Sequence, residues 1–214
     1  MKIVAISDTH SYHRKVVVPD GDILICAGDI TWRGELTIIA DFCNWMKELP
    51  HHNKIVVFGN HELNTQSGSN RGVALQMVKD AGAIYLEDSG CKINELEIYG
   101  SPYQPYFNDW EYNLPRDGKE LREKWSQIPE TVDVLVTHGP PYGILDGVDR
   151  VPEPQGCKLL KKRVMQLSDL KIHAFGHLHK DGSKTVKLGH TVFANAAICD
   201  DNYDPCRKPI VIEI

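Results

Sequence analysis

The chain has 214 residues, 42% of them hydrophobic and 25% charged, which is ordinary for a globular protein with a substantial core. A formal net charge of −5 argues against a protein that binds duplex nucleic acid through a basic face. No repeat, linker or low-complexity tract interrupts the sequence, so we predict a single domain over residues 1–214.

The first 58 residues predict a strand, a strand, a helix and a strand with short connections. Segments 2–7, 22–27 and 54–58 are rich in Val, Ile and Leu on both faces, which is typical of buried strands. Between the last two, the apolar residues of segment 35–49 recur at helical spacing up to Pro50, so we predict a helix there.

The middle of the chain predicts one helix and three short strands. The helix covers residues 73–81 and ends at Gly82. The strands follow at 84–86, 91–93 and 96–99, and a turn at residues 94–95 joins the last two. Residues 100–116 contain five aromatic residues and three prolines without a periodic pattern.

The remaining residues predict a second group of elements. Helices are expected at 119–125 and 157–167, with a strand at 132–136 and a loop rich in glycine and proline at 139–156 between them. Later strands are expected at 172–175, 183–188, 191–196 and 210–214, and we assign these to the second group. One domain with two sheets and outer helices fits this order best.

Five of the predicted strands end at side chains that bind metals or transfer protons. These side chains are Asp8 and His10, Asp29, Asn60, His138, and His177 with His179. Taken singly, each has an ordinary structural explanation, but their repetition at five strand ends favours a shared site. Because the carboxyl ends of strands in an open α/β sheet lie along one edge, we expect these seven side chains to form one cluster.

The donor atoms of this set are imidazole nitrogens and carboxylate or amide oxygens, without a thiolate. That mixture suits Mn²⁺, Fe or Zn²⁺ better than Ca²⁺, which prefers oxygen ligands alone. Seven side chains exceed the needs of one four-coordinate ion, and a bridging carboxylate would divide them between two. Only Asp8 and Asp29 are formally negative, so two divalent ions would leave the site positive and suited to phosphate.

The order of these residues resembles a known family. The motifs are Asp-x-His at 8–10, Gly-Asp at 28–29, Gly-Asn-His-Glu at 59–62, Thr-His-Gly-Pro-Pro at 137–141 and Gly-His-Leu-His at 176–179. Together they resemble the calcineurin-like metallophosphoesterases. Four further segments are similar to the metallophosphoesterase-domain (MPPED-type) subgroup of this family. These segments are residues 27–31, 54–62, 113–116 and 138–143.

The resemblance implies an α/β fold, a four-layer αββα sandwich of two mixed sheets flanked by helices. It also implies two divalent ions per chain, for which we expect Mn²⁺, with Fe, Zn²⁺ and Mg²⁺ as alternatives. The ligands it implies are Asp8, His10 and His179 for the first ion, Asn60, His138 and His177 for the second, and Asp29 as the bridge.

The resemblance further implies a phosphoesterase in which hydroxide held by the ions attacks phosphorus and His61 protonates the leaving oxygen. We favour a phosphodiesterase for small or nucleotide-like esters, including cyclic nucleotides. The alternatives are a phosphomonoesterase or protein phosphatase, a nuclease, and a scaffold protein that binds nucleotides without turnover. The sequence does not predict the oligomeric state.

Four further residues are candidates for substrate contact. Trp32 and Arg33 follow Asp29 closely enough to line the site, and Trp110 could stack a nucleobase. Arg116 could meet a phosphate through its planar guanidinium. Each also has an ordinary alternative, because aromatic residues of segment 100–116 can cover a sheet edge and exposed arginines usually bind nothing specific. Glu62, where many relatives have Asp, either orients His61 or lies on the surface.

The six cysteines include no CxxC pair, and Cys26 and Cys43 fall in apolar patterns typical of core residues. A disulfide between Cys199 and Cys206 is an alternative to the reduced thiols that we favour. The chain starts directly on a strand, and no apolar run reaches the length of a membrane span. We therefore expect a cytoplasmic protein without a membrane partner.

Overall fold

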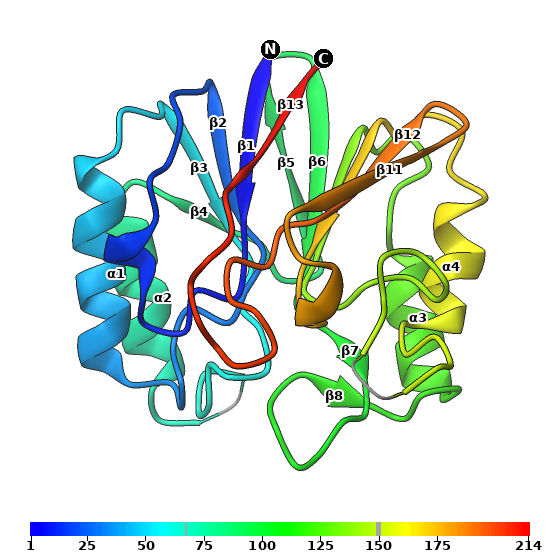
Figure 1. The fold of residues 1–214 in the computed structure, drawn as a ribbon, viewed down its shortest axis with the longest axis horizontal. Helices are drawn as coiled ribbons and strands as arrows, with labels where there is room; N and C mark the ends of the chain where they lie inside the picture. The colour runs from blue at the N-terminus through cyan, green and yellow to red at the C-terminus, as the bar shows by residue number, and fades with distance from the viewer. Residues whose placement is uncertain (67, 149–150) are drawn as a thin grey trace.

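Two β-sheets lie face to face in the computed structural model, which describes residues 1–66, 68–148 and 151–214, and helices cover the outer face of each sheet (Figure 1). On one side are α1 (Leu36–Glu48) and α2 (Arg71–Asp80), and on the other are α3 (Lys119–Ser126) and α4 (Lys158–Val164). The arrangement is the predicted four-layer αββα sandwich. Part of the loop predicted at 139–156, residues 149–150, lies outside the described residues.

The first sheet has the strand order β13-β1-β2-β3-β4. Its strands are β1 (Lys2–Ile6), β2 (Ile23–Cys26), β3 (Asn53–Val56), β4 (Ile84–Tyr85) and β13 (Ile210–Glu213). The first four are parallel, and β13 pairs antiparallel with β1. The assignment of the C-terminal strand to the second group is therefore wrong. Only one face of β13 is buried, as is usual for an antiparallel edge strand, and such a strand fits either sheet.

The second sheet has the strand order β11-β12-β10-β9-β6-β5. Its strands are β5 (Ser89–Ile93), β6 (Leu96–Ser101), β9 (Val134–Thr137), β10 (Ile172–Phe175), β11 (Lys184–Leu188) and β12 (Thr191–Asn195). The hairpin between β5 and β6 turns at Asn94, which has a φ of 52°. Segment 100–116 contains two short parallel strands that the sequence did not predict, β7 (Gln104–Pro105) and β8 (Asn113–Leu114).

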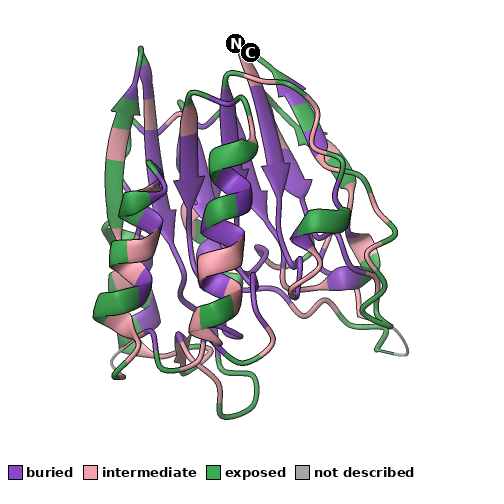
Figure 2. Ribbon diagram, turned by 90° about the vertical axis from the view of Figure 1, so that its left-hand side faces the viewer, coloured by how far each residue is buried: buried purple, intermediate pink, exposed green. Residues whose placement is uncertain are grey.

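The apolar character of the strands on both faces follows from the layers. Along β1, Ile3 and Ala5 pack into the core between the sheets, whereas Val4 and Ile6 belong to the cluster that includes the helices. Figure 2 shows that the central strands are almost wholly buried, whereas edge strands and the outer side of the helices carry exposed residues. Two apolar layers per sheet hold the strands in a fixed register, which positions the loops at their ends.

The carboxyl ends of the parallel strands of both sheets meet at one edge. There Ser7, just after β1, forms a bridge to Ala197, just after β12, and its N–H donates to Ala196 O at 2.8 Å. The loops that follow β1, β2, β3, β9 and β10 therefore face one another. All six cysteines carry free thiols. Within the described residues, no helix has the length and apolar character needed to cross a membrane.

Candidate metal centre

The loops at this edge turn sharply where the predicted ligands begin. Asp8, His10, Asp29 and His177 have positive φ angles of 52°, 40°, 52° and 67°, a region that residues other than glycine rarely adopt. Such strain is common at functional sites and persists only where the surrounding structure imposes it.

Gly59 precedes the predicted ligand Asn60 and Gly176 precedes His177, and each glycine leaves room for a carboxylate. A Cβ on Gly59 would overlap Asp29 Oδ1, and a Cβ on Gly176 would overlap Asp8 Oδ2. The two backbone segments thus approach the carboxylates as closely as only glycine allows.

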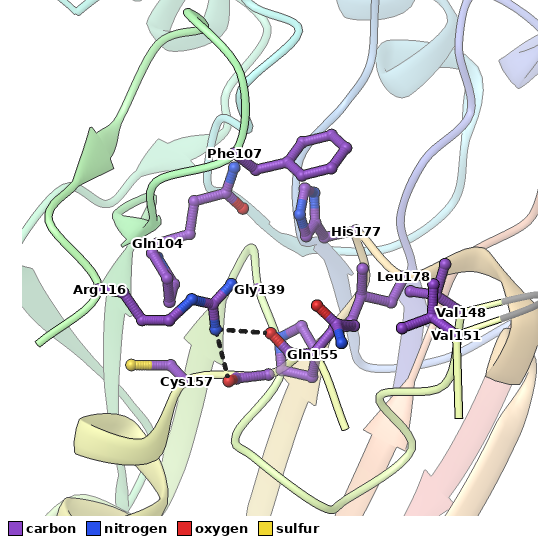
Figure 3. Close-up of a pocket in the computed structure, with 13 residues that line it drawn as sticks. Gln104, Phe107, Arg116, Gly139, Val148, Val151, Gln155, Cys157, His177 and Leu178 are labelled. Atoms are coloured by element: carbon purple, nitrogen blue, oxygen red, sulfur yellow. Dashed lines mark hydrogen bonds between the residues drawn. The ribbon is translucent and has the colours of Figure 1, made fainter. Parts of the chain in front are cut away.

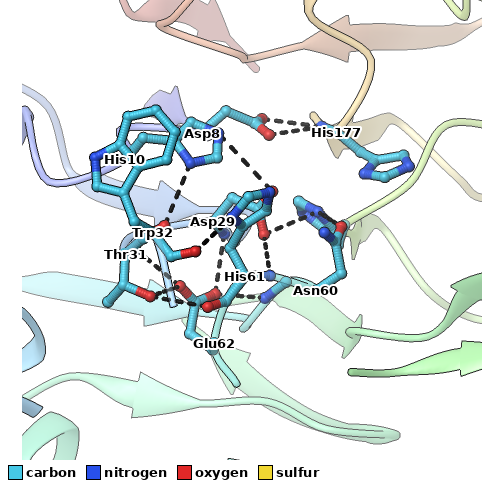
Figure 4. A network of polar contacts seen from close by, with 12 residues as sticks. Asp8, His10, Asp29, Thr31, Trp32, Asn60, His61, Glu62 and His177 are labelled. Carbon is cyan, nitrogen blue, oxygen red and sulfur yellow. Dashed lines mark hydrogen bonds and ion pairs between the residues drawn. The ribbon is translucent and has the colours of Figure 1, made fainter. Parts of the chain in front are cut away.

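The structure brings all seven predicted ligands together. Three overlapping groups have donor atoms within 4.8 Å of one another, and they are Asp8, His10 and His179; His10, Asp29 and His61; and Asp29, His138 and His177. Asn60 joins the last group, since its Oδ1 lies 3.0 Å from His138 Nε2. Asp29 connects the groups: its carboxylate oxygens lie 3.3 Å from His138 Nε2 and 3.9 Å from the Nε2 atoms of His10 and His61 (Figure 4).

Most of the imidazoles are fixed in orientation by the backbone. Four have Nδ1 within hydrogen-bond distance of a carbonyl oxygen: His10 with Thr31 (3.3 Å), His61 with Trp32 (2.7 Å), His138 with Ala27 (2.8 Å) and His179 with Asp200 (2.8 Å). When Nδ1–H donates to a carbonyl, the lone pair of Nε2 is left for a ligand. These rings are therefore prepared to present Nε2 to the cluster.

His177 is held differently. Its backbone N–H donates to the Asp8 carboxylate at 2.9 and 3.1 Å, but no hydrogen bond to its imidazole occurs within residues 1–66, 68–148 and 151–214. The ring instead packs edge-on against His138 at 5.0 Å and Phe107 at 5.8 Å between centroids. Burial, and then the neighbouring His138, lower the pKa of His177 to about 3. The imidazole is thus neutral and able to act as a ligand.

The two carboxylates stay ionised although they are buried. Burial alone would raise the pKa of Asp8, but the hydrogen bond and charge of His179 lower the pKa to about 2. Burial would likewise raise the pKa of Asp29, and His138 and His61 bring it well below its ordinary value. Burial would lower the pKa of His138, whereas the Asp29 carboxylate raises it to about 9. A cation bound between Asp29 and His138 would compete with this proton.

The donor set fits two divalent cations. It combines two ionised carboxylates, one amide oxygen and imidazole nitrogens, nearly all of them buried, and a bound cation would displace the proton that Asp29 favours on His138. One cation could be held by Asp8, His10 and His179 and a second by Asn60, His138 and His177, with Asp29 between them.

Glu62 does not lie on the surface, and within the described residues no hydrogen bond joins its carboxylate to the imidazole of His61. It is fully buried, not on the surface, and its carboxylate accepts backbone N–H bonds from Gly59 (2.7 Å), Asp29 (3.0 Å) and Thr31 (2.9 Å). Figure 4 shows it beneath the cluster. Burial, and then the charge of Asp29, raise the pKa of Glu62 to about 8. Glu62 therefore ties the loop after β2 to the loop after β3, and it acts on the ring of His61 only through these loops.

Two cavities lined by described residues adjoin the cluster. We call the first the cleft; its volume is about 160 Å³ and its lining is Asp29, Asn60, His61, Phe107, Val148, His177, Leu178, His179, Asp201 and Tyr203. The second, the side pocket, has a volume of about 130 Å³ (Figure 3). Its lining is Gln104, Pro105, Phe107, Arg116, Gly139, Pro140, Val148, Val151, Gln155, Gly156, Cys157, His177 and Leu178. The shared residues make the two cavities neighbours.

The predicted substrate residues occupy different places. Trp32 lies beside His10, with ring centroids 5.0 Å apart, and Trp110 lies beside His61 at 4.1 Å. Arg116 lines the side pocket, where Nη1 donates to two backbone carbonyls, away from the two carboxylates of the cluster. Arg33 is exposed, and its side chain makes no contact with the cluster in the part of the chain that the structure describes.

Sequence reasoning missed two residues at the site. Tyr203 packs against His10 at 4.9 Å and His179 at 5.1 Å, and its only signal is that it is an aromatic residue in an Asp-rich loop. Gln104 donates from Nε2 to Asn60 Oδ1 at 2.9 Å, and nothing in the sequence marks it.

Sequence comparison finds the same family. The family model described as calcineurin-like phosphoesterase (Metallophos) matches residues 1–181. Human metallophosphoesterase domain-containing protein 1 is 39% identical over all of this chain and 71% of its own length. The UPF0046 protein K07C11.7 of Caenorhabditis elegans is 36% identical over all of this chain and 75% of its own length.

Solved structures share the fold at low identity. The phosphopantetheinyl hydrolase PptH of Mycobacterium tuberculosis superposes with a TM-score of 0.62 at 17% identity, covering 94% of this chain and 90% of that one. The protein TT1561 of Thermus thermophilus gives a TM-score of 0.61 at 14% identity, covering 99% of this chain and 98% of that one. At these identities the likeness extends to the fold alone.

Proposed function

This chain belongs to the calcineurin-like phosphoesterase family, and on that premise we propose that it is a metal-dependent phosphodiesterase for small or nucleotide-like esters, cyclic nucleotides included. The observation that carries the proposal is that seven side chains able to bind metals, Asp29 among them, come together from five strand ends. A buried cluster of this composition favours hydrolysis over a purely structural role.

The ligands would divide into two subsites around Asp29. The first subsite is Asp8, His10 and His179, and the second subsite is Asn60, His138 and His177. When bound, two divalent cations, of which we favour Mn²⁺, supply Lewis acidity that activates water and neutralises charge on phosphoryl oxygens. The carboxylates of Asp8 and Asp29 provide the negative charge that holds them.

His61 is our candidate for the general acid. Its Nδ1–H donates to Trp32 O at 2.7 Å, so Nε2 points toward Asp29 and the cleft. When Nε2 also carries a proton, the ring can transfer that proton to the oxygen that leaves phosphorus. The Trp110 ring at 4.1 Å covers one side of the imidazole and limits the access of water.

The preference for a diester is supported by the two cavities. An acyclic phosphodiester carries two organic substituents, and the cleft and the side pocket share a boundary that includes Phe107 and His177. A monoester has one such substituent and would use only one cavity. Asp201 at the edge of the cleft also disfavours the more negative monoester.

A panel of esters tests this function in the Mn²⁺-reconstituted protein. The panel compares bis(p-nitrophenyl) phosphate, p-nitrophenyl phosphate and the 2′,3′- and 3′,5′-cyclic nucleotides, with Asp29→Asn as the blank. We expect the diesters to be hydrolysed faster than the monoester. A faster monoester would indicate a phosphomonoesterase or protein phosphatase, and cleavage of single-stranded DNA would indicate a nuclease. Tight AMP or GMP binding without hydrolysis of any ester would indicate a scaffold protein.

A further inference from the structure

The side pocket has the size of a site for one small group. Its volume of about 130 Å³ is close to the roughly 150 Å³ of a protein cavity that binds benzene. It is well below the roughly 300–1,000 Å³ of pockets for drug-sized ligands. The pocket therefore accommodates one ring rather than a whole substrate.

The walls favour an uncharged ring. Phe107, Val148, Val151 and Leu178 give the pocket apolar sides, and no acidic side chain belongs to its lining among the described residues. Among the described residues, Arg116 is the one permanently charged residue of the lining. A cationic group would meet Arg116 without a balancing carboxylate, whereas a ring with acceptor atoms would not.

Gln104 supplies a hydrogen-bond acceptor without a partner. Its Nε2 uses both hydrogens, donating to Asn60 Oδ1 at 2.9 Å and Asn113 Oδ1 at 3.0 Å. Asn113 donates its own Nδ2 to Phe107 O, so its oxygen faces Gln104 and fixes the orientation of the Gln104 amide. Gln104 is 1% exposed, and within the described residues its Oε1 has no hydrogen-bond partner. A buried acceptor of this kind is stabilised by a ligand that brings a donor.

Gly139 and Arg116 complete this wall of the pocket, opposite Val148 and Val151 (Figure 3). A Cβ at Gly139 would lie 3.4 Å from Gln104 Oε1, in van der Waals contact, so a side chain at this position would cover the acceptor. Arg116 uses Nη1 on two backbone carbonyls, and its Nη2 makes no hydrogen bond within the described part of the chain. The wall therefore offers an acceptor and a donor together.

We propose, on the basis of the hydrolysis proposed above, that the side pocket binds the ester substituent that remains on phosphorus. That substituent is an uncharged six-membered ring with adjacent N–H and C=O groups, as in a uracil-type base. Its N–H donates to Gln104 Oε1, and its carbonyl accepts from Arg116. The leaving group lies in the cleft, because His61 lines the cleft and not the side pocket.

The proposed reaction is an ordinary hydrolysis of one phosphoester bond. Water releases one proton to solvent and its oxygen bonds to phosphorus, while the bond from phosphorus to the leaving oxygen breaks. The leaving oxygen gains a proton from His61, which takes up a proton from solvent afterwards. The ring stays on the monoester product.

Three p-nitrophenyl diesters test the proposal, with the Mn²⁺-loaded protein and release of p-nitrophenol as the readout. They are the 5′-phosphodiester of uridine, the same ester of N3-methyluridine, which lacks the N–H, and methyl p-nitrophenyl phosphate, which has no ring. We expect kcat/KM to be about tenfold higher for the uridine ester than for the N3-methyluridine ester. Equal values for these two esters would overturn the proposal.

The variant Gly139→Ala places a methyl group beside Gln104 Oε1. The preference for the uridine ester is its kcat/KM divided by the kcat/KM of the methyl ester. We expect Gly139→Ala to lower this ratio by about tenfold. Gly72→Ala is the control, because a Cβ there meets nothing within 4 Å, and it should keep the wild-type ratio. An unchanged ratio in Gly139→Ala would contradict the proposal. If that variant does not fold, the pair of uridine esters in the wild-type protein decides.

The two proposals fail in different ways. Wild-type protein that hydrolyses methyl p-nitrophenyl phosphate but does not discriminate between the uridine esters refutes the side-pocket assignment alone. Wild-type protein that hydrolyses none of the three esters refutes the proposed function, and the assignment with it.

Discussion

The two subsites differ in how firmly their ligands are held. In the first, His10 and His179 each bond to a backbone carbonyl, and the ring of Tyr203 packs on both. In the second, His138 is held in the same way, but the imidazole of His177 has no hydrogen bond within the described residues. Its neighbour Phe107 is 54% exposed.

This difference separates metal retention from substrate contact. A subsite whose rings are already oriented loses less conformational freedom when an ion binds, so the first subsite should bind its ion more tightly. The second subsite adjoins the side pocket through His177, and Gln104 links Asn60 to Asn113. We therefore expect bound substrate to change the metal affinity of the second subsite more than that of the first.

Asp29→Asn should break both subsites at once, because the carboxylate of Asp29 lies between them. We expect metal content after dialysis to fall at both subsites and hydrolysis to fall to the level of metal-free protein. Asp117→Asn is the control, since Asp117 is exposed and lies away from the cluster. Elemental analysis beside the activity assay checks this, and a variant that keeps two ions and full turnover would refute the role of Asp29.

His61→Ala should remove the proton donor while leaving both subsites filled. General acid catalysis contributes about 10²–10⁴-fold, so turnover of a cyclic nucleotide, whose leaving alkoxide needs a proton, should fall by about that factor with the metal content unchanged. His190→Ala, at an exposed position, should behave as wild type. A parallel loss of metal and activity would instead indicate that His61 is a metal ligand. Its position within 4.8 Å of donor atoms of His10 and Asp29 is compatible with that role.

His177→Ala and His179→Ala compare the two subsites directly. We expect His177→Ala to lower the affinity for the second ion and to leave the first ion bound. Loss of an outer hydrogen-bond partner lowers metal affinity by roughly 10–100-fold, and loss of a ligand should lower it by more. His179→Ala should weaken the first ion instead. Titration of metal-free protein with Mn²⁺ by calorimetry separates the two steps, and identical losses in both variants would contradict two distinct subsites.

Glu62→Gln should have the smallest effect on turnover and a clear effect on stability. Nε2 of the new amide would face a backbone N–H where the carboxylate now accepts one, so we expect a loss of about 1–3 kcal/mol of folding free energy. Denaturant unfolding measures it, with the exposed Glu130→Gln as the control. Wild-type stability in Glu62→Gln would show that the two loops are held by other contacts.

The sequence predicts the buried strands well because each lies between two apolar layers, and a run such as residues 23–26 is apolar on both faces for that reason. The sheet that receives β13 is not predictable in this way. Its alternation of buried and exposed residues fits an edge of either sheet, and the pairing with β1 joins the two ends of the chain. The strands β7 and β8 have two residues each, too few for a pattern.

The cluster could be predicted because the same arrangement, an apolar strand followed by a ligand, occurs at five strand ends. The residues that orient the ligands could not. Gln104 reaches Asn60 across 44 positions of the sequence, and Tyr203 reaches His10 from near the other end of the chain. Glu62 acts through backbone N–H groups, and because nearly every residue has one, the residue types do not reveal its partners.

Anomalous diffraction from wild-type crystals soaked in Mn²⁺ tests the two-subsite centre most directly. We predict two peaks on either side of the Asp29 carboxylate, one next to Asp8, His10 and His179 and the other next to Asn60, His138 and His177. A single peak, or strong peaks only at positions away from Asp29, would contradict this arrangement.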